Sequence, residues 1–157
     1  MIQVEKVTDD LLREIKELNK DFYGNAVLEW YINPNILNAV CVCYRDTNGI
    51  LRGYIFVTCI SELYYKALIK GDYIEELEDK YILYVKQSPY WYISSVVVDR
   101  EYQRKGIATQ LLNTLMQHPF EHLCAVTVSK EGKALLSKCL DVKEQISENC
   151  FILEKEL

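Results

Sequence analysis

Apolar residues near the N-terminus change from the spacing of a strand to that of a helix. Residues 2–7 predict a short opening strand. Thr8 is a suitable helix N-cap, and apolar side chains then recur at helical spacing to about residue 20, at Leu11, Leu12, Ile15 and Leu18. Residues 22–37 suggest a second helix that is interrupted near Pro34, because proline lacks the N–H that a helix interior needs.

Two strands and a turn follow, and then a segment of mixed character. Residues 39–44 and 51–60 form apolar runs typical of strands, and the Asn48-Gly49 step between them is a strong hairpin signal. Residues 61–87 combine a helical patch that ends at Gly71 with a second, acidic helical patch. We interpret this segment as an insertion that lies over one side of the domain.

The second half of the chain predicts strands that alternate with helices. The strongest strand covers residues 91–98, and a polar loop at 99–105 leads into a helix at 106–117. A strand at 123–128, a helix at 131–140 and a closing hairpin of 142–146 and 150–155 complete the chain. We therefore expect a single α/β domain over residues 1–157, with an antiparallel front half and one parallel strand pair.

Composition and charge limit the partners of the protein. The chain has 157 residues and a net charge of −5, and its densest basic group, Arg100, Arg104 and Lys105, is too small to follow a phosphate backbone. No stretch approaches the ~20 apolar residues of a membrane span, and the first residues lack an apolar segment of signal-peptide length. We expect a cytoplasmic protein with no nucleic-acid partner and no membrane partner.

The cysteine and histidine pattern predicts no metal site. The six cysteines include no C-x-x-C pair, and most lie within apolar runs, which is typical of free thiols packed as small apolar side chains. Cys41 and Cys43 should share one strand face, but two thiols alone make a poor metal site. We interpret His118 and His122, which flank a helix end and a strand start, as structural residues.

The segment with the clearest chemistry is the connection between the strand at 91–98 and the helix that follows. The strand ends at Asp99, and the first turn of the helix contains the small residues Gly106 and Ala108. The free N–H groups of a helix N-terminus bind phosphate, and small residues let a ligand approach the backbone. The residues alone are equally compatible with an ordinary strand–turn–helix connection that carries a solvated basic loop.

The same segment carries a family resemblance. The run Gln103-Arg104-Lys105-Gly106-Ile107-Ala108 resembles the Q/R-x-x-G-x-G/A signature of the GNAT superfamily of N-acetyltransferases. The flanking residues suit the pattern, and the order of strands and helices is similar along the whole chain. The resemblance implies a GNAT-like acyl-CoA N-acyltransferase fold, acetyl-CoA as cosubstrate without a metal, and an amine of a small molecule or peptide as acceptor. Many members dimerise, so a homodimer is one expected assembly.

The resemblance also implies roles for individual residues. The main chain of the loop would bind the pyrophosphate of coenzyme A, through Gln103, Arg104, Lys105, Gly106, Ile107 and Ala108, with Thr109 close by. The preceding strand would be splayed from its parallel neighbour at 124–128, so that Val96, Val97 and Val98 pair with the pantetheine arm. The N–H group of Val97 or Val96 would polarise the thioester carbonyl.

The sequence departs from the family at both positions where an acid or base is common. Ser94 and Ser95 stand where the strand often carries an acid, and Ser137 stands where a later helix often carries a tyrosine. A serine is a poor base but can hold a water, so Ser95 is a candidate for that role, and Tyr92, Ser137 and Cys139 are candidate proton donors. Core packing is the alternative role of Cys139, and an ordinary strand face is that of the two serines.

The predicted insertion could supply groups for a cationic amine. It contains acidic residues and aromatic residues, which together suit a cation, although a solvated helix face is the simpler explanation. These residues are Glu62, Glu75, Glu76, Glu78, Asp79, Tyr64, Tyr65 and Tyr73. The departures from the pattern leave two alternatives to an enzyme: a non-catalytic acyl-CoA-binding sensor or regulatory module, and an interaction domain whose ligand site is vestigial.

Overall fold

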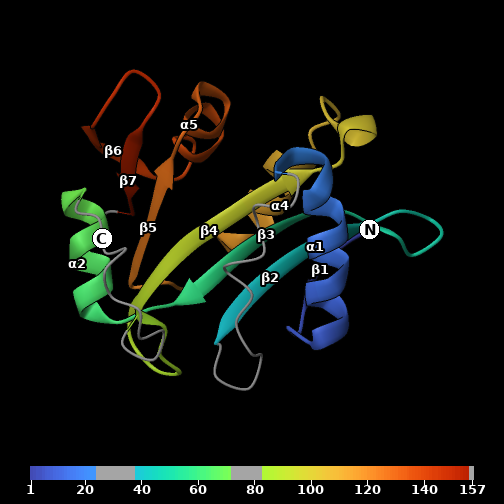
Figure 1. Ribbon diagram of the computed structural model, residues 1–157, viewed down its shortest axis with the longest axis horizontal. Coiled ribbons are helices and arrows are strands. Elements are labelled where there is room, and N and C mark those ends of the chain that lie inside the picture. Colours follow the sequence, from blue (N-terminus) through green and yellow to red (C-terminus); the bar gives the residue numbers. More distant parts are fainter. Residues whose placement is uncertain (24–37, 72–82, 156–157) are drawn as a thin grey trace.

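Seven strands form one sheet in the part of the chain that the computed structural model describes, residues 1–23, 38–71 and 83–155 (Figure 1). They lie in the order β1-β2-β3-β4-β5-β7-β6. Only the β4–β5 pair is parallel among these neighbours. The strands are β1 (Ile2–Glu5), β2 (Ala39–Arg45), β3 (Leu51–Cys59), β4 (Tyr90–Val98), β5 (His122–Thr127), β6 (Asp141–Gln145) and β7 (Phe151–Glu154). The predicted mixed, mostly antiparallel α/β fold is confirmed.

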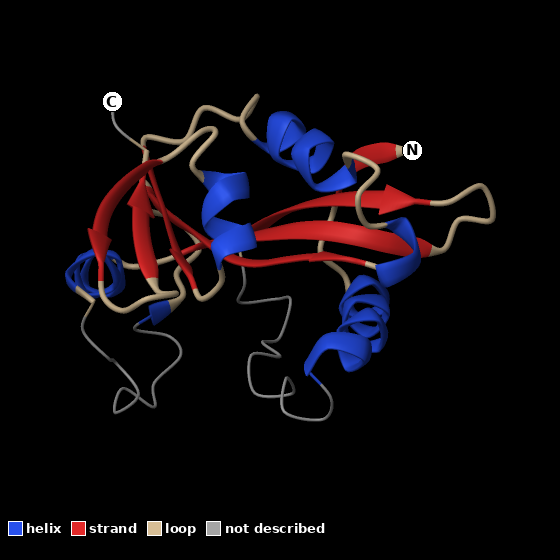
Figure 2. Cartoon of the chain, turned by 90° about the horizontal axis from the view of Figure 1, so that it is seen from above, coloured by secondary structure: helices blue, strands red, loops and turns tan. Residues whose placement is uncertain are grey.

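Helices cover both faces of this sheet. α1 (Asp9–Tyr23) and α4 (Ile107–Leu115) lie on opposite faces, as Figure 2 shows from above. α2 (Glu62–Lys70) lies on the face of α1, and α5 (Lys130–Leu136) lies on the face of α4. A short 3-10 helix, η2 (Arg100–Tyr102), precedes α4. We call the two sides the α1–α2 face and the α4–α5 face.

The ends of the helices differ in part from the prediction. α2 begins after Ser61, whose Oγ accepts a hydrogen bond from Tyr64 N at 3.2 Å, and it ends at Gly71. The helix expected over residues 131–140 stops at Leu136, because the backbone then forms tighter turns in which Cys139 N donates to Leu136 O at 3.1 Å. Residues 24–37, with most of the second helix expected there, and the acidic patch at 73–79 lie outside the described residues.

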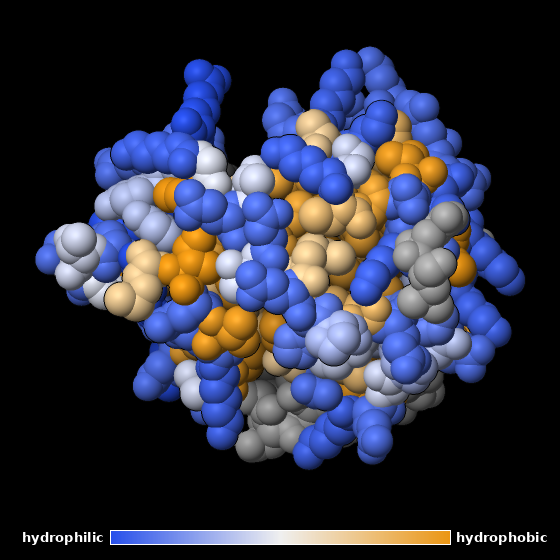
Figure 3. Space-filling view, turned by 180° about the vertical axis from the view of Figure 1, so that it is seen from behind, coloured by the Kyte–Doolittle hydropathy of each residue, from blue (hydrophilic) through white to orange (hydrophobic). Residues whose placement is uncertain are grey.

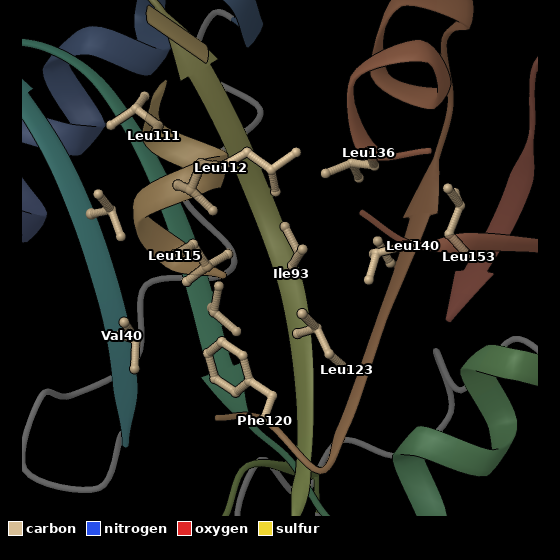
Figure 4. Packing of buried hydrophobic residues seen from close by; sticks show 14 of the residues in the cluster. Val40, Ile93, Leu111, Leu112, Leu115, Phe120, Leu123, Leu136, Leu140 and Leu153 are labelled. Atoms are coloured by element: carbon tan, nitrogen blue, oxygen red, sulfur yellow. The ribbon is translucent and has the colours of Figure 1, made fainter. Parts of the chain in front are cut away.

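The main hydrophobic core lies between α4 and the sheet (Figure 4). α4 buries the apolar face that its sequence predicts, at Ile107, Leu111, Leu112 and Leu115. A second cluster joins α1 to the other face of the sheet through Leu11, Leu12, Ile15 and Leu18. Thr8 caps α1 by accepting a hydrogen bond from Leu11 N at 3.1 Å, as its position before the apolar run predicts.

The six cysteines are free thiols, as the sequence predicts. Cys41 and Cys43 do share one strand face, and their Sγ atoms lie 3.5 Å apart in the cluster under α1. Within residues 1–23, 38–71 and 83–155, no helix has both the length and the apolar character needed to cross a membrane.

Arg45 joins β1, β2 and α1 at one end of the sheet. Its Nε atom lies 2.8 Å from Glu5 Oε2, and its Nη1 atom lies 2.6 Å from Glu14 Oε2. The side chains of Arg45 and Glu5 are only 18% and 17% exposed, so solvent screens this pair less than an open surface pair. The hydrogen bond from Arg45 holds the pKa of Glu5 below its ordinary value.

We expect Arg45→Met to lower the free energy of unfolding by about 2 kcal/mol at neutral pH, because it leaves two carboxylates without their shared cation. Since the pKa of Glu5 is lowered in the folded protein, the ion pair contributes its full stability above the ordinary pKa of 4.5 and loses it as the pH falls. Urea unfolding from pH 7 to pH 3 should therefore show the two proteins becoming more alike in acid.

The control for this prediction is Arg13→Met. Arg13 lies 2.6 Å from Asp10, but both side chains are open to solvent, at 70% and 85% exposed. Its loss should change the free energy of unfolding by no more than about 0.5 kcal/mol. A gap between wild type and Arg45→Met that stays constant down to pH 3 would contradict the role given to Glu5.

Candidate functional site

The parallel strands β4 and β5 separate partway along their length. They pair only from Tyr90 with His122 to Ile93 with Ala125. Beyond this point they diverge, which Figure 4 shows as a widening gap between the two ribbons with Ile93 on one side and Leu140 on the other. The register between β3 and β4 shifts at the same place, leaving Ser94 as an extra residue whose Oγ donates to Phe56 O at 3.1 Å.

Among the described strands, none pairs with the part of β4 beyond Ile93 on the side that β5 has left, so this edge of β4 is free there. Asp99 N donates to Arg52 O at 2.7 Å, and Arg52 is opposite Asp99 in the ladder, so alternate residues back along the strand, Val97 and Ser95, also point their N–H groups at β3. The backbone groups of Val96 and Val98 therefore point to the open side. One of these groups, the Val98 carbonyl oxygen, accepts a hydrogen bond from Gln103 Nε2 at 3.0 Å.

The turn before α4 presents its backbone to solvent. Gly106 has a φ of 79°, and a Cβ atom built on it would meet nothing within 4 Å. Arg104 also has a positive φ, of 62°. The first backbone hydrogen bond of α4 runs from Gln110 N to Gly106 O at 3.1 Å. The N–H groups of residues 107–109 therefore lie at the helix end without an acceptor inside the helix. This geometry suits an anion in contact with the main chain.

Asp99 and Arg52 hold the loop that leads to this turn. Asp99 Oδ1 accepts a hydrogen bond from Glu101 N at 3.0 Å, and Arg52 Nη1 lies 3.1 Å from Asp99 Oδ2. Arg52 also pairs with Asp46 at 2.9 Å, so the hairpin after β2 is tied to the loop. Two cationic groups lie over the ring of Tyr102: Arg52 Cζ is 5.2 Å and Lys105 Nζ is 5.3 Å from the ring centroid.

The sequence did not indicate the roles of Arg52 and Asp46. Arg52 lies 47 residues before Asp99 in the chain, and only the β3–β4 register brings the two together. The one nearby signal in the sequence is the Asn48-Gly49 turn. It predicts the hairpin but not the contact between this hairpin and the loop that begins at Asp99.

Two of the four candidate catalytic residues follow α5. Ser137 is exposed, and its Oγ donates to Ala134 O at 3.3 Å within its own turn. Cys139 is partly buried and packs against the core cluster, as its alternative interpretation expects. Between them Lys138 reaches α4, where its Nζ donates to Thr109 Oγ1 at 3.0 Å.

The α4–α5 face carries apolar surface near these residues. Figure 3 shows apolar side chains gathered in the middle of this face and bordered by polar ones. The partly buried apolar residues that α4, α5 and the turn after α5 contribute against the core are Ala108, Met116, Leu135 and Cys139.

Tyr92 and Ser95 lie instead on the α1–α2 face of β4. Tyr92 packs edge-on against Tyr64, with ring centroids 5.9 Å apart, and burial raises the pKa of Tyr92, so its hydroxyl keeps its proton at neutral pH. The Ser95 and Tyr54 hydroxyls lie 2.8 Å apart. The four candidates thus form two separate pairs, one on each face of the sheet, rather than one cluster.

Several of the remaining polar residues that the sequence singled out have partners within this protein where they are described. Glu62 pairs with Lys66 at 2.7 Å on α2, and the Tyr65 hydroxyl donates to Glu154. The His122 ring stacks on Tyr90 with centroids 4.7 Å apart. No three His, Cys, Asp or Glu side chains gather in a metal-binding group within the described ranges. Tyr73, Glu75, Glu76, Glu78 and Asp79 lie outside those ranges.

Comparisons with solved structures find the same fold in acetyltransferases. The Escherichia coli GNAT family N-acetyltransferase YhbS, solved in complex with CoA, is 15% identical with a TM-score of 0.63, over 99% of this chain and 79% of that one. NAA60 from Arabidopsis thaliana in complex with acetyl-CoA is 14% identical with a TM-score of 0.61, over 100% of both chains. A GNAT superfamily phosphinothricin acetyltransferase from Sinorhizobium meliloti in complex with AcCoA is 14% identical with a TM-score of 0.61, over 99% of this chain and 88% of that one.

Sequence comparison gives two further results. No curated protein sequence matches this chain. The model of the acetyltransferase (GNAT) family, in contrast, matches residues 10–137, which include the split between β4 and β5 and the turn before α4. The chain therefore belongs to the acetyltransferase (GNAT) family.

Proposed function

We propose that the protein transfers an acetyl group from acetyl-CoA to a primary amine of a small molecule or protein, by direct attack of the amine. The observation that carries this proposal is the free edge of β4 beside the open turn at Gly106. A strand edge pairs with an extended amide chain, and a helix N-terminus binds phosphate, so together the two features suit the pantetheine arm and pyrophosphate of coenzyme A. Solved structures with this fold that hold CoA or acetyl-CoA support the choice of cosubstrate.

In this proposal the cosubstrate contacts the main chain more than side chains. The N–H groups from residue 104 to 109 receive the pyrophosphate oxygens, and Arg104 and Lys105 add positive charge. The Gln103 N–H, which the sequence also suggested, donates instead to Arg100 O at 3.4 Å. Val96 N–H, Val96 C=O and Val98 N–H pair with the pantetheine amides. Of the two residues suggested for the thioester carbonyl, Val96 is favoured, because the N–H of Val97 points toward β3.

The reaction needs no covalent enzyme intermediate. The neutral amine nitrogen attacks the thioester carbon, the C–N bond forms, and the negative charge that develops on the carbonyl oxygen is stabilised by the Val96 N–H. The C–S bond then breaks, the nitrogen loses one proton to water, and the CoA thiolate gains one from Tyr92, Cys139, Ser137 or water. Ser95 contacts the amine side of the reaction, on the α1–α2 face.

One observation favours a second candidate, an acyl-CoA-binding sensor of the same fold. The Ser94 and Ser137 hydroxyls, which stand where an acid or base is common, both donate to backbone carbonyls of this protein. Neither is then available as a proton donor to a thiolate without breaking that bond. A sensor would bind acetyl-CoA by the same main-chain contacts and release no CoA.

Two measurements test the proposal. Acetyl-CoA at about 100 times its Kd should stabilise the folded protein by about 2.7 kcal/mol and raise Tm by about 5 °C or more. Release of free CoA thiol should then depend on an added amine, tested with tyramine, spermidine and a lysine-containing peptide. A rise in Tm without amine-dependent release would favour the sensor, and no rise in Tm would contradict both candidates.

Assembly and location belong to the same proposal. We expect a cytoplasmic enzyme that acts without a metal and without a nucleic-acid or membrane partner, either alone or as a homodimer. Light scattering of the purified protein with and without acetyl-CoA distinguishes the two assemblies.

A further inference from the structure

A short chain of hydrogen bonds crosses the α1–α2 face from α1 through β3 to β4. The Tyr54 hydroxyl donates to Asn19 Oδ1 at 2.6 Å, and the Ser95 hydroxyl lies 2.8 Å from the Tyr54 hydroxyl. Asn19 and Tyr54 are only 1% and 0% exposed, whereas Ser95 is partly exposed. The chain thus begins in the interior and ends beside the place where β4 separates from β5.

The direction of these hydrogen bonds follows from the protons available. A tyrosine hydroxyl has one proton, and Tyr54 gives it to Asn19 Oδ1. The bond between Tyr54 and Ser95 must therefore use the Ser95 proton, with the Tyr54 oxygen as acceptor. The Ser95 oxygen is left with its lone pairs and can only accept a further hydrogen bond. Hydrogen bonds in such a chain polarise one another, which makes the Ser95 oxygen a stronger acceptor.

These hydrogen bonds between Asn19, Tyr54 and Ser95 stabilise the fold less well than apolar packing at the same place would. Asn19 Nδ2 is buried and has no hydrogen-bond partner among the described residues, and a buried donor without an acceptor costs stability. Four apolar side chains, Leu11, Leu12, Ile15 and Leu18, already attach α1 to the sheet, so an apolar residue at position 19 would pack α1 at least as well. A role at the partly exposed end, Ser95, accounts for a polar group here better than packing does.

We propose that Asn19 and Tyr54 are positioning residues that turn the Ser95 proton inward, so that the Ser95 oxygen accepts a hydrogen bond from the N–H of the attacking amine. This inference rests on the proposed function. As the C–N bond forms, the amine nitrogen becomes positive and its N–H groups become stronger donors, so the contact strengthens in the transition state. Ser95 takes no proton, which agrees with the low basicity of a serine hydroxyl. The acceptor nitrogen must therefore keep at least one N–H during attack, as a primary amine does.

The test is a double-mutant cycle of Tyr54→Phe and Ser95→Ala in the full-length chain, with the amine among tyramine, spermidine and the lysine peptide that releases CoA fastest. Each single variant should lower kcat about tenfold, the size of one ordinary hydrogen bond, with the Kd of acetyl-CoA changed by no more than about twofold. The double variant should be no slower than the single ones, because Tyr54 acts through Ser95.

Three further variants separate positioning from structure. Ser95→Thr keeps a hydroxyl and should retain kcat within about threefold of wild type. Asn19→Leu frees the Tyr54 proton to turn toward Ser95, so kcat should fall about tenfold while the urea midpoint stays the same or rises. Thr58→Val, which removes another buried hydroxyl on the same face of β3 as Tyr54, should leave kcat unchanged.

Different results would contradict the role of Ser95 and the proposed function. Amine-dependent CoA release by wild type with additive losses in the cycle, or with losses that follow the fall in stability, would overturn the inference alone. A wild type that binds acetyl-CoA but releases no CoA with any amine would overturn the proposed function, and this inference with it.

Discussion

Gly106→Glu is expected to weaken CoA binding at least about 100-fold, or about 2.7 kcal/mol. The substitution acts in two ways. A side chain at a φ of 79° strains the backbone of the turn, and no atom of the described residues lies within 4 Å of the added Cβ atom. If the pyrophosphate occupies that space, the glutamate meets both the volume and the negative charge of the phosphates. Titration calorimetry with CoA and with acetyl-CoA measures the loss.

The hairpin turn offers a matched control for this experiment. Gly49 has the same φ of 79°, and a Cβ atom on it would also meet nothing within 4 Å. Gly49→Glu therefore introduces comparable strain and the same charge at a site away from the proposed ligand. Both variants should lose a similar amount of stability, about 1 kcal/mol, but only Gly106→Glu should lose CoA binding. Equal affinities for the two variants would show that the turn is not the pyrophosphate site.

Removing one main-chain N–H from β4 is expected to slow acetyl transfer about 100-fold. The change is an amide-to-ester substitution that replaces Val96 with 2-hydroxyisovaleric acid, which keeps the side chain and removes the N–H. Because this N–H points to the open edge of β4, the pairing with β3 stays intact. The group should stabilise charge that develops only in the transition state, so kcat should fall far more than the affinity for acetyl-CoA.

The edge strand β1 provides the same residue type in the same backbone situation. Met1 and Arg45 exchange both of their backbone hydrogen bonds, at 2.9 and 3.0 Å, so by alternation the N–H of Val4 points outward from the sheet. The ester at Val4 should leave kcat and stability unchanged. If the Val96 ester weakens acetyl-CoA binding as much as it slows turnover, the Val96 N–H binds acetyl-CoA and the transition state equally well. It then contributes to substrate affinity and not to kcat.

The sequence predicted the order of the elements because most of its signals are local. Thr8 caps α1, the Asn48-Gly49 step closes the first hairpin, and the apolar spacing around Leu111 and Leu115 matches the buried face of α4. Each of these depends on residues within a few positions of one another. The early end of α5 was not predicted, since the spacing of Leu136 and Leu140 suits a helix, whereas the backbone between them forms tight turns.

The candidate site was less accessible from sequence because it depends on contacts between distant segments. The loop at 103–109 was found through its signature, but its support by Arg52 required the β3–β4 register. Likewise, nothing near Ser95 in the chain indicates Asn19 or Tyr54, and the three meet only when α1 packs on the sheet. The sequence also did not predict that the four candidate catalytic residues lie on two faces of the sheet. Tyr92 and Ser95 lie on the α1–α2 face, and Ser137 and Cys139 lie on the α4–α5 face.

The extra residue in β4 also constrains how this strand can change during evolution. Side chains three positions apart point to opposite faces of a regular strand, but Tyr92 and Ser95 share a face because Ser94 lies between the two registers. Deleting Ser94 would close the irregularity and leave every later side chain of β4 on its present face, because Ile93 and Ser95 already lie opposite adjacent residues of β3. We therefore expect homologues whose β4 differs in length to differ by one residue at this irregularity, with the side chains beyond it on the same faces.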